Sequence, residues 1–239
     1  MSPENTVNST SGDRVEYPLA PFQELDDVPK DAWGYGDVMG SVAPAAPKWK
    51  KLPKVKFLDQ SASPDTKMAC SRFALAHVSN VQNAVQYSSL DLQVDPAKLW
   101  AEYVKQYPLA KDVGATMISA TDEFRKLGLI SGYLVCRTVD EVKAAIDAGR
   151  FIYTGSRKGD WAKTKETKVY KVGQFPCAHI TAYFGYNTKY VFGVNSYGED
   201  DGLFAVEWPT FMSPEFMTKL AICDRSDVEP LLQYRLSRQ

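Results

Sequence analysis

The sequence predicts an α+β protein in which helices dominate the first half of the chain and antiparallel strands the second. Apolar residues recur at helical spacing in several segments between residues 70 and 148. After residue 151, short runs of β-branched and aromatic residues typical of strands take their place. Helices and strands are therefore segregated rather than alternating, which favours two lobes over a series of βαβ units.

Four helices are predicted before the strands begin. The first should start near Cys70, because apolar residues follow it with the spacing of a buried helical stripe: Ala74, Val78, Val81 and Val85. Three more are expected at residues 96–106, 115–127 and 139–148. Pro96 suits the first turn of its helix, and a glycine after each of the last two segments suits a helix C-terminus.

Strands are predicted from residue 151 onward, beginning with residues 151–154. The lysine-rich segment 157–171 is expected to be a loop or hairpin. Residues 177–198 then predict a β-hairpin, since two strand-like runs flank a turn-like segment at 185–189.

The predicted hairpin carries one of the chain's two histidines. If its turn is centred on Asn187, His179 and Asn195 are directly opposed, with Cβ atoms roughly 4.5–5.5 Å apart. An amide that accepts from one imidazole nitrogen orients the ring and leaves the other nitrogen free for chemistry. A one-residue slip of the register would instead put the two side chains on opposite faces.

Length and composition indicate a soluble globular protein. The 239 residues are 44% hydrophobic and 24% charged, and no apolar run approaches the roughly 20 residues that span a bilayer. The net charge of −1 provides no general attraction to nucleic acid or to a membrane. The polar start has no secretory signal, so a cytoplasmic location is expected, with other non-secreted locations such as a viral particle left open.

The four cysteines lack CxxC spacing, which argues against a structural zinc site and defines no disulfide framework. The sequence also has no Gly-rich phosphate loop and no HExxH motif. No metal and no cofactor are therefore expected.

Residues 1–47 are predicted to form an extended acidic arm, because they carry eight carboxylates against Arg14 and Lys30. Residues 48–239 would form the folded domain, with a helical lobe at about 57–135 and a β lobe at about 136–225. The lysine run at 48–56 is either a solvated charge run or a surface that docks the arm or an acidic partner. The binding of a protein partner through this arm is left as an open possibility.

A nucleophile for the histidine is available in Cys70. A cysteine in the first turn of a helix lies at the positive end of the macrodipole, which favours the thiolate. Without further context such a cysteine is more often a small buried apolar residue.

In chain order, Gln60, Cys70, His179 and Asn195 resemble the catalytic residues of the papain-like cysteine peptidases. The matching stretches are LDQ ending at Gln60, ACSRFALA around Cys70, CAHITAYFGY around His179 and NSYGEDDGLFAV from Asn195. Residues 114–133 also look like the family's segment before the crossover to the second lobe. The resemblance spans roughly residues 50 to 210.

This sequence departs from the family pattern at several positions. Ser71 follows the cysteine where the family usually has Trp, and Tyr197 stands where a Trp usually follows Asn-Ser. The gap between Gln60 and Cys70 is longer than the family's short Gly-rich loop. His179 and Asn195 come 109 (179 − 70) and 125 (195 − 70) residues after Cys70, against about 130–150 in the family, which indicates a trimmed member.

The resemblance implies a two-lobe fold with the active cleft between the lobes, and cysteine-type hydrolysis of a peptide or protein substrate. Cys70 would attack the carbonyl, His179 would protonate the leaving amine and Asn195 would orient His179. The Gln60 side chain and the Cys70 N–H would stabilise the oxyanion, and water would release the acyl-enzyme. The alternatives are an inactive papain-like scaffold that serves binding or assembly, and a related acyl transfer on a non-protein substrate.

Three other features have structural interpretations. His77 is expected to be a structural or partly exposed histidine, and Cys177 to be a packing residue, although it shares a strand face with His179. The segment 157–171 combines six basic residues with Trp161 and Tyr170, a mixture that also occurs in nucleic-acid-binding proteins. A solvated hairpin bordering the cleft is favoured, so a nucleic acid partner is not expected.

Overall fold

The structure is a computed structural model that describes residues 27–39, 55–87, 93–198 and 202–224. Its centre is an antiparallel sheet with the strand order β1-β6-β2-β3-β4-β5. The strands are β1 (Gly132–Cys136), β2 (Ile152–Ser156), β3 (His179–Tyr186), β4 (Tyr190–Val194), β5 (Leu203–Glu207) and β6 (Lys219–Cys223). Helices mixed with an antiparallel sheet confirm the predicted α+β class.

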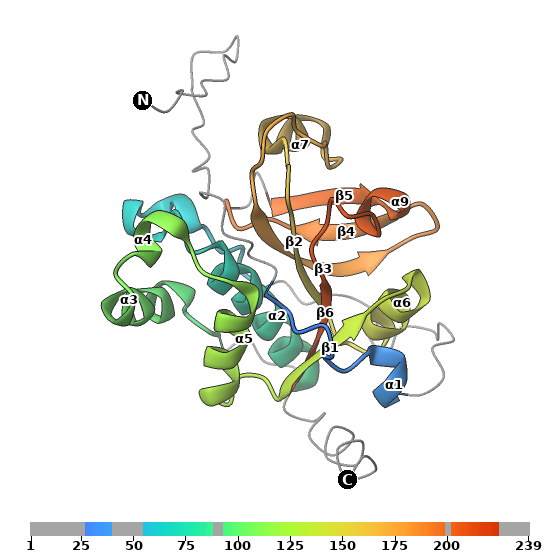
Figure 1. Ribbon diagram of the computed structural model, residues 1–239, viewed down its shortest axis with the longest axis horizontal. Helices are drawn as coiled ribbons and strands as arrows, with labels where there is room; N and C mark the ends of the chain where they lie inside the picture. The colour runs from blue at the N-terminus through green and yellow to red at the C-terminus, as the bar shows by residue number, and fades with distance from the viewer. Residues whose placement is uncertain (1–26, 40–54, 88–92, 199–201, 225–239) are drawn as a thin grey trace.

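The helices gather on two sides of this sheet (Figure 1). One group is α2 (Cys70–Tyr87), α3 (Pro96–Gln106), α4 (Ala110–Val113) and α5 (Met117–Lys126), preceded by the short 3-10 helices η1 (Gln60–Ala62) and η2 (Pro64–Thr66). The other is α1 (Tyr35–Met39), α6 (Val139–Asp147) and α9 (Trp208–Phe211), while α7 (Trp161–Thr167) lies at one end of the sheet, at the top of Figure 1.

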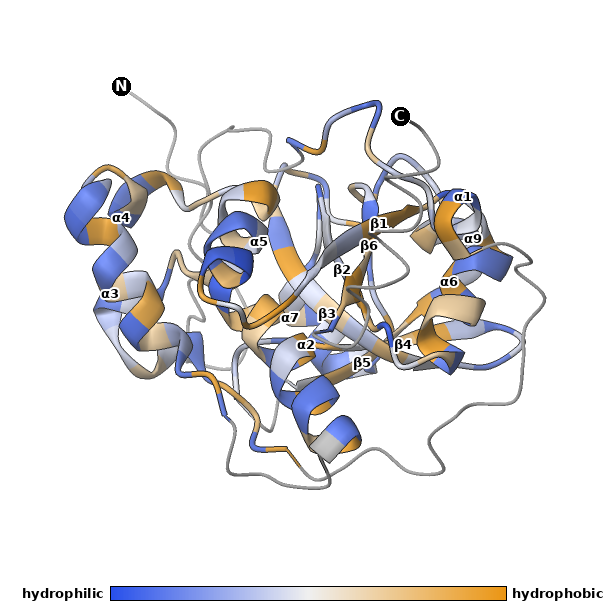
Figure 2. Ribbon diagram, turned by 90° about the horizontal axis from the view of Figure 1, so that it is seen from below, coloured by the Kyte–Doolittle hydropathy of each residue, from blue (hydrophilic) through white to orange (hydrophobic). Residues whose placement is uncertain are grey.

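Helix α2 is the main contact between the helical group and the sheet. Ala74, Val78 and Val81 are buried in a core shared with β2, β3 and β6, as the predicted stripe requires. The opposite face of the sheet packs on α6 and α9 around Tyr183 and Phe211. Figure 2 shows hydrophilic and hydrophobic residues mixed along α3 and α5, which is the pattern of helices with one buried face. None of the helices in the described ranges is long and apolar enough to cross a membrane.

The four predicted helices are all present. Helix α3 has the predicted bounds. Asp95 caps its start by accepting hydrogen bonds from the backbone N–H groups of Ala97 and Lys98. Helices α5 and α6 are followed by Gly128 and Gly149, whose φ angles of 66° and 79° are left-handed. These glycines therefore end the helices as predicted.

The prediction that 157–171 is a loop or hairpin is wrong for residues 161–167, which form α7. Asp160 starts this helix by accepting a hydrogen bond from the Lys163 backbone. Trp161 and Thr164, three residues apart, are its buried side chains. Because only one apolar and one polar side chain are buried, the sequence of this helix has no recognisable helical periodicity of apolar residues.

The predicted hairpin is β3 and β4, but its register differs from the prediction. Ala182 pairs with Val194, whereas a turn centred on Asn187 would pair it with Phe192. The turn is instead closed by Asn187, whose side-chain oxygen accepts from the backbone N–H of Lys189 and Tyr190. The shift is two residues at Ala182 and Tyr183 and three residues nearer the turn, because a bulge lies between Tyr183 and Gly185. At Ala182 and Tyr183 it equals one full side-chain period, so the strand faces there are those predicted.

Part of the predicted arm packs on the domain. Gly34 bridges Val135 at the outer edge of β1, where the Val135 N–H donates to the Trp33 carbonyl at 2.8 Å. Asp27 accepts a hydrogen bond from the Ile118 backbone at the start of α5. Residues 27–39 therefore cover an edge strand, while residues 1–26 and 40–47 lie outside the described residues. The boundary at residue 47 stays a prediction.

The chain also passes from the helices into the sheet before the predicted boundary between the two lobes, because β1 begins at Gly132. Residues 132–135 of strand β1 fall within the segment of about 57–135 predicted as the helical lobe, yet the whole strand is paired with β6. Strand β6 in turn fills the place between β1 and β2. Residues 219–223 thus complete the sheet.

Candidate active site

His179 and Asn195 are in contact, as predicted. The Nε2 atom of His179, the first residue of β3, lies 2.7 Å from Oδ1 of Asn195. This oxygen also accepts a hydrogen bond from the Ser196 N–H at 2.8 Å, which fixes the orientation of the amide. Since Oδ1 only accepts, Nε2 carries the proton and Nδ1 is left with a lone pair. This is the tautomer that a general base requires.

Two aromatic rings enclose His179, which is 4% exposed. Tyr197 stacks on the imidazole with ring centroids 5.1 Å apart and an interplanar angle of 20°. Trp161 meets the imidazole edge-on at 4.9 Å. Sequence reasoning noted Tyr197 only as a replacement for Trp, and it missed the contact made by Trp161, which depends on the unpredicted helix α7.

Gln60 joins this group through the backbone. Its N–H donates to the Ser196 carbonyl at 2.7 Å, and its side-chain Oε1 accepts from the Ser196 hydroxyl. Its Nε2 donates to the Lys67 carbonyl at 2.7 Å. A carboxamide nitrogen has two hydrogens, so this contact uses one of them. The long segment between Gln60 and Cys70 contains η1 and η2, and it keeps Gln60 beside the residue that follows Asn195.

Cys70 is the first residue of α2, as predicted, and is 8% exposed. Burial raises the pKa of the Cys70 thiol above its ordinary value, and the backbone N–H of Ile180, the residue after His179, acts in the opposite direction. The expectation that the helix start would favour the thiolate is therefore wrong for this structure.

Burial also disfavours the charged form of the histidine. It lowers the pKa of His179 to about 4, with the Asn195 hydrogen bond acting in the opposite direction. No hydrogen bond joins Cys70 to His179 among the described residues. Burial therefore favours the neutral form of both the Cys70 thiol and the His179 imidazole.

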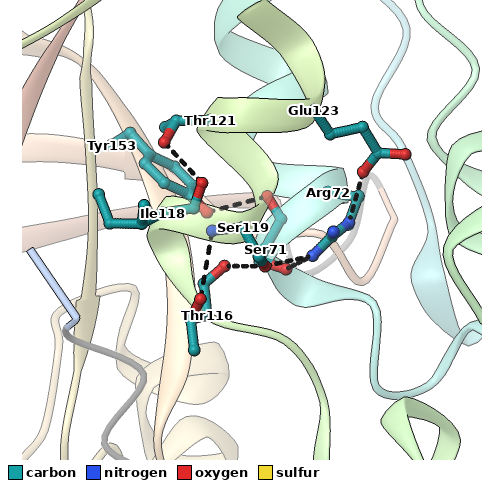
Figure 3. Close-up of polar contacts among 8 residues, drawn as sticks. All are labelled: Ser71, Arg72, Thr116, Ile118, Ser119, Thr121, Glu123 and Tyr153. Atoms are coloured by element: carbon teal, nitrogen blue, oxygen red, sulfur yellow. Dashed lines mark hydrogen bonds and ion pairs between the residues drawn. The ribbon is translucent and has the colours of Figure 1, made fainter. Parts of the chain in front are cut away.

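A buried ionic network anchors the start of α2 (Figure 3). Arg72 is fully buried and donates from Nε to Glu123 of α5 at 3.0 Å. Its Nη1 donates to the hydroxyls of Ser71 and Ser119 at 3.2 and 3.1 Å, and the Tyr153 hydroxyl donates to the Ser71 carbonyl at 3.2 Å. The turn that carries Cys70 is therefore tied to α5 and to β2.

Arg72 also contacts α3. Its guanidinium carbon lies 3.7 Å from the centroid of the Tyr103 ring, which is cation–π contact distance. The network was not predicted from the sequence, since its partners are 47 and 51 residues away.

The remaining histidine and cysteines lie outside this group. His77 is structural, as predicted, but it is buried rather than partly exposed, and its Nε2 accepts from the Leu58 N–H at 3.3 Å. Cys136 and Cys223 are buried core thiols, and Cys177 is partly exposed. Within the described ranges, no three or more His, Cys, Asp or Glu side chains are grouped so that they could hold a metal ion.

The fold is similar to that of a solved cysteine protease. The crystal structure of xylellain, a cysteine protease from Xylella fastidiosa, superimposes with a TM-score of 0.64 over 87% of this chain and 97% of that one. The two sequences are 13% identical, so the likeness concerns the fold. No protein-family model and no curated protein matches the sequence.

Proposed function

We propose that this protein hydrolyses peptide bonds as a papain-like cysteine endopeptidase acting on peptides or proteins. The observation that carries the proposal is the 2.7 Å contact between His179 Nε2 and Asn195 Oδ1, which leaves Nδ1 with a lone pair. The hydrogen bonds that tie Gln60 to Ser196 and the position of Cys70 beside the His179–Ile180 peptide support it. The cysteine-protease fold agrees with this chemistry.

Burial sets the order of the steps. Since both Cys70 and His179 favour their neutral forms, the thiol proton moves to His179 Nδ1 as sulfur attacks the carbonyl carbon. The carbon–sulfur bond forms while the carbonyl electron pair moves to oxygen. The Cys70 N–H and the remaining Gln60 Nε2 hydrogen stabilise that oxyanion. Collapse breaks the carbon–nitrogen bond, and the leaving amine takes the proton from Nδ1.

Hydrolysis of the acyl-enzyme uses the same residues. Water gives a proton to Nδ1 as its oxygen attacks the thioester carbon, and collapse of this second tetrahedral species breaks the carbon–sulfur bond. The sulfur regains the proton and the carboxylic acid product leaves. Asn195 holds the ring through Nε2 in both halves of the reaction.

A second candidate is an inactive papain-like scaffold with a binding or assembly role. The observation in its favour is the state of Cys70, which is buried, has a raised pKa and makes no hydrogen bond to His179 within the described residues.

Cleavage of a mixed peptide library, followed by mass spectrometry, separates the two candidates. We expect new termini with the wild-type protein and none with Cys70→Ala, whose folded state is checked by circular dichroism. If the wild type and Cys70→Ala give the same cleavage products, or if neither cleaves any peptide, the inactive scaffold explains the structure better than the peptidase.

A further inference from the structure

Residues that follow the scissile bond of a substrate must lie on the His179 side of the site, if the proposed function holds. In that reaction His179 Nδ1 delivers a proton to the leaving amine. The leaving part of the peptide therefore passes the strand that carries His179. The protein surface beside that strand then faces the substrate side chains that follow the scissile bond.

The lysine-rich segment lies beside His179. Ser156 pairs with His179 in the β2–β3 register, and Lys158 bridges Cys177, two residues before His179. Neighbouring strands are about 4.8 Å apart, and two residues along a strand span about 6.5 Å. Trp161, at the start of α7, touches the imidazole itself. The start of this segment is thus next to the catalytic ring.

The charge of this segment is strongly positive. Residues 157–171 contain six basic and two acidic side chains, a net charge of +4 (6 − 2). Lys158 and Lys163 are exposed and have no ion-pair partner among the described residues. The nearby carboxylates serve the fold: Asp160 caps α7, and Glu215 accepts from the Lys158 backbone and from the Tyr170 hydroxyl.

Two exposed apolar side chains accompany the lysines. Val172 is 55% exposed and Phe175 is 52% exposed. Val172 faces Gly159 across an antiparallel bridge, which places it beside Lys158. The aromatic rings within the lysine-rich segment point inward instead, since Trp161 and Tyr170 are buried against each other. They offer no stacking platform for nucleic acid bases.

We propose that Lys158, Lys163, Val172 and Phe175 form a leaving-side surface that selects substrates with acidic residues, accompanied by apolar ones, directly after the scissile bond. The inference rests on the proposed peptidase function and adds the substrate class. Exposed charges at the rim of a binding site chiefly govern discrimination between charged partners and the salt dependence of association.

The test compares peptides that share the residues before the scissile bond and carry Glu, Gln or Lys at the three positions after it. With the wild-type protein we expect kcat/KM to be about tenfold higher for the Glu peptide than for the Lys peptide at low salt. The double variant Lys158→Glu/Lys163→Glu should reverse this preference, so that the Lys peptide is cleaved faster than the Glu peptide. The matched control Lys98→Glu/Lys126→Glu makes the same charge change on exposed lysines of α3 and α5 and should keep the wild-type preference.

The outcomes separate this inference from the proposed function. An unchanged Glu-to-Lys ratio in the double variant, with the Gln peptide still cleaved, overturns the leaving-side surface alone. If no peptide is cleaved, the proposed function fails, and binding to Cys70→Ala measured by fluorescence anisotropy decides whether the lysines still select the Glu peptide. Lysine-dependent binding of a single-stranded oligonucleotide, without such dependence for the Glu peptide, would also overturn the inference.

Discussion

His179 and Asn195 form a 2.7 Å hydrogen bond although they are not paired across the hairpin. Strand β4 ends at Val194, and the Asn195 N–H donates to the Gly202 carbonyl on the β5 side. Extending the register of Ala182 with Val194 places His179 opposite Tyr197, so Asn195 lies two residues along the facing strand and the two side chains meet diagonally. The contact requires that both side chains lie on the same face of the sheet and are long enough to meet, and it does not require that the two residues are directly paired.

Replacing Asn195 should therefore impair catalysis more than stability. In Asn195→Ala the ring of His179 keeps its stacking on Tyr197 but loses the acceptor at Nε2. We expect kcat to fall by roughly a hundredfold, because small misplacements of a catalytic group cost about that much, while KM changes little. Steady-state kinetics on one peptide measures both.

The matched control for Asn195→Ala is Tyr197→Phe, which retains the stacked ring and should keep kcat within a few-fold of wild type. Equal losses in the two variants would contradict the orienting role of the hydrogen bond.

Gln60 provides a test of oxyanion stabilisation that leaves the thiol untouched. Gln60→Ala should lower kcat by about 10²–10³, as loss of one oxyanion donor does elsewhere. Alkylation of Cys70 by iodoacetamide forms no oxyanion, so its rate should stay near that of the wild type. Ser196→Ala removes only the hydroxyl that binds Gln60 Oε1 and should have a smaller effect on kcat. Parallel losses of peptide cleavage and alkylation in Gln60→Ala would place the effect at Cys70 instead.

The helices that the sequence predicted best are those with long periodic stripes. Helix α2 buries Ala74, Val78 and Val81 as expected, and α3 starts at Pro96 behind its Asp95 cap. Such signals are local: a stripe and a cap are encoded within one helix. Helix α7 escaped prediction because its stability comes from contacts of Trp161 with Tyr170 and Phe204.

The four candidate site residues were proposed because their order along the chain resembles a known family, and their catalytic roles stay predictions. Their protonation state could not be predicted, since the pKa values of Cys70 and His179 depend on burial by residues distant in sequence. The register of β3 and β4 depended on the hydrogen bonds of Asn187. A symmetric turn centred on that residue was the simplest assumption, and it was wrong by three positions next to the turn and by two beyond the bulge between Tyr183 and Gly185.

Acid should destabilise the fold through its two histidines. Burial lowers the pKa of both His77 and His179 to about 4, whereas an unfolded histidine titrates near 6.5. Between these values the unfolded chain binds protons that the folded chain does not, so stability is full above pH 6.5 and falls as the pH drops toward 4. The change in protonation of each histidine lowers the free energy of unfolding by roughly 3 kcal/mol as the pH falls from 6.5 to 4.

Urea unfolding at pH 7, 5.5 and 4.5 measures this loss. The variant His77→Gln keeps an acceptor for the Leu58 N–H and removes one titrating group, so its free energy of unfolding should depend less steeply on pH. The comparison cancels the carboxylates that both proteins share. Equal slopes for the two proteins would contradict the lowered pKa of His77.

The Arg72–Glu123 pair should show an asymmetric response to mutation. The Arg72 side chain is 0% exposed, and that of Glu123 is 21% exposed. Glu123→Leu leaves a buried guanidinium without its counterion, which should cost about 3–5 kcal/mol of unfolding free energy. Arg72→Met leaves a carboxylate that water can reach, so it should cost less.

The double variant Arg72→Met/Glu123→Leu decides whether charge is the cause. Because it buries no unpaired charge, it should recover most of the stability lost in Glu123→Leu when unfolding is followed in urea. The exposed pair of Arg125 with Asp122 is the control, and Asp122→Ala should change stability by less than about 1 kcal/mol. Additive losses in the double variant would mean that packing of the two side chains, rather than their charges, holds the first turn of α2 in place.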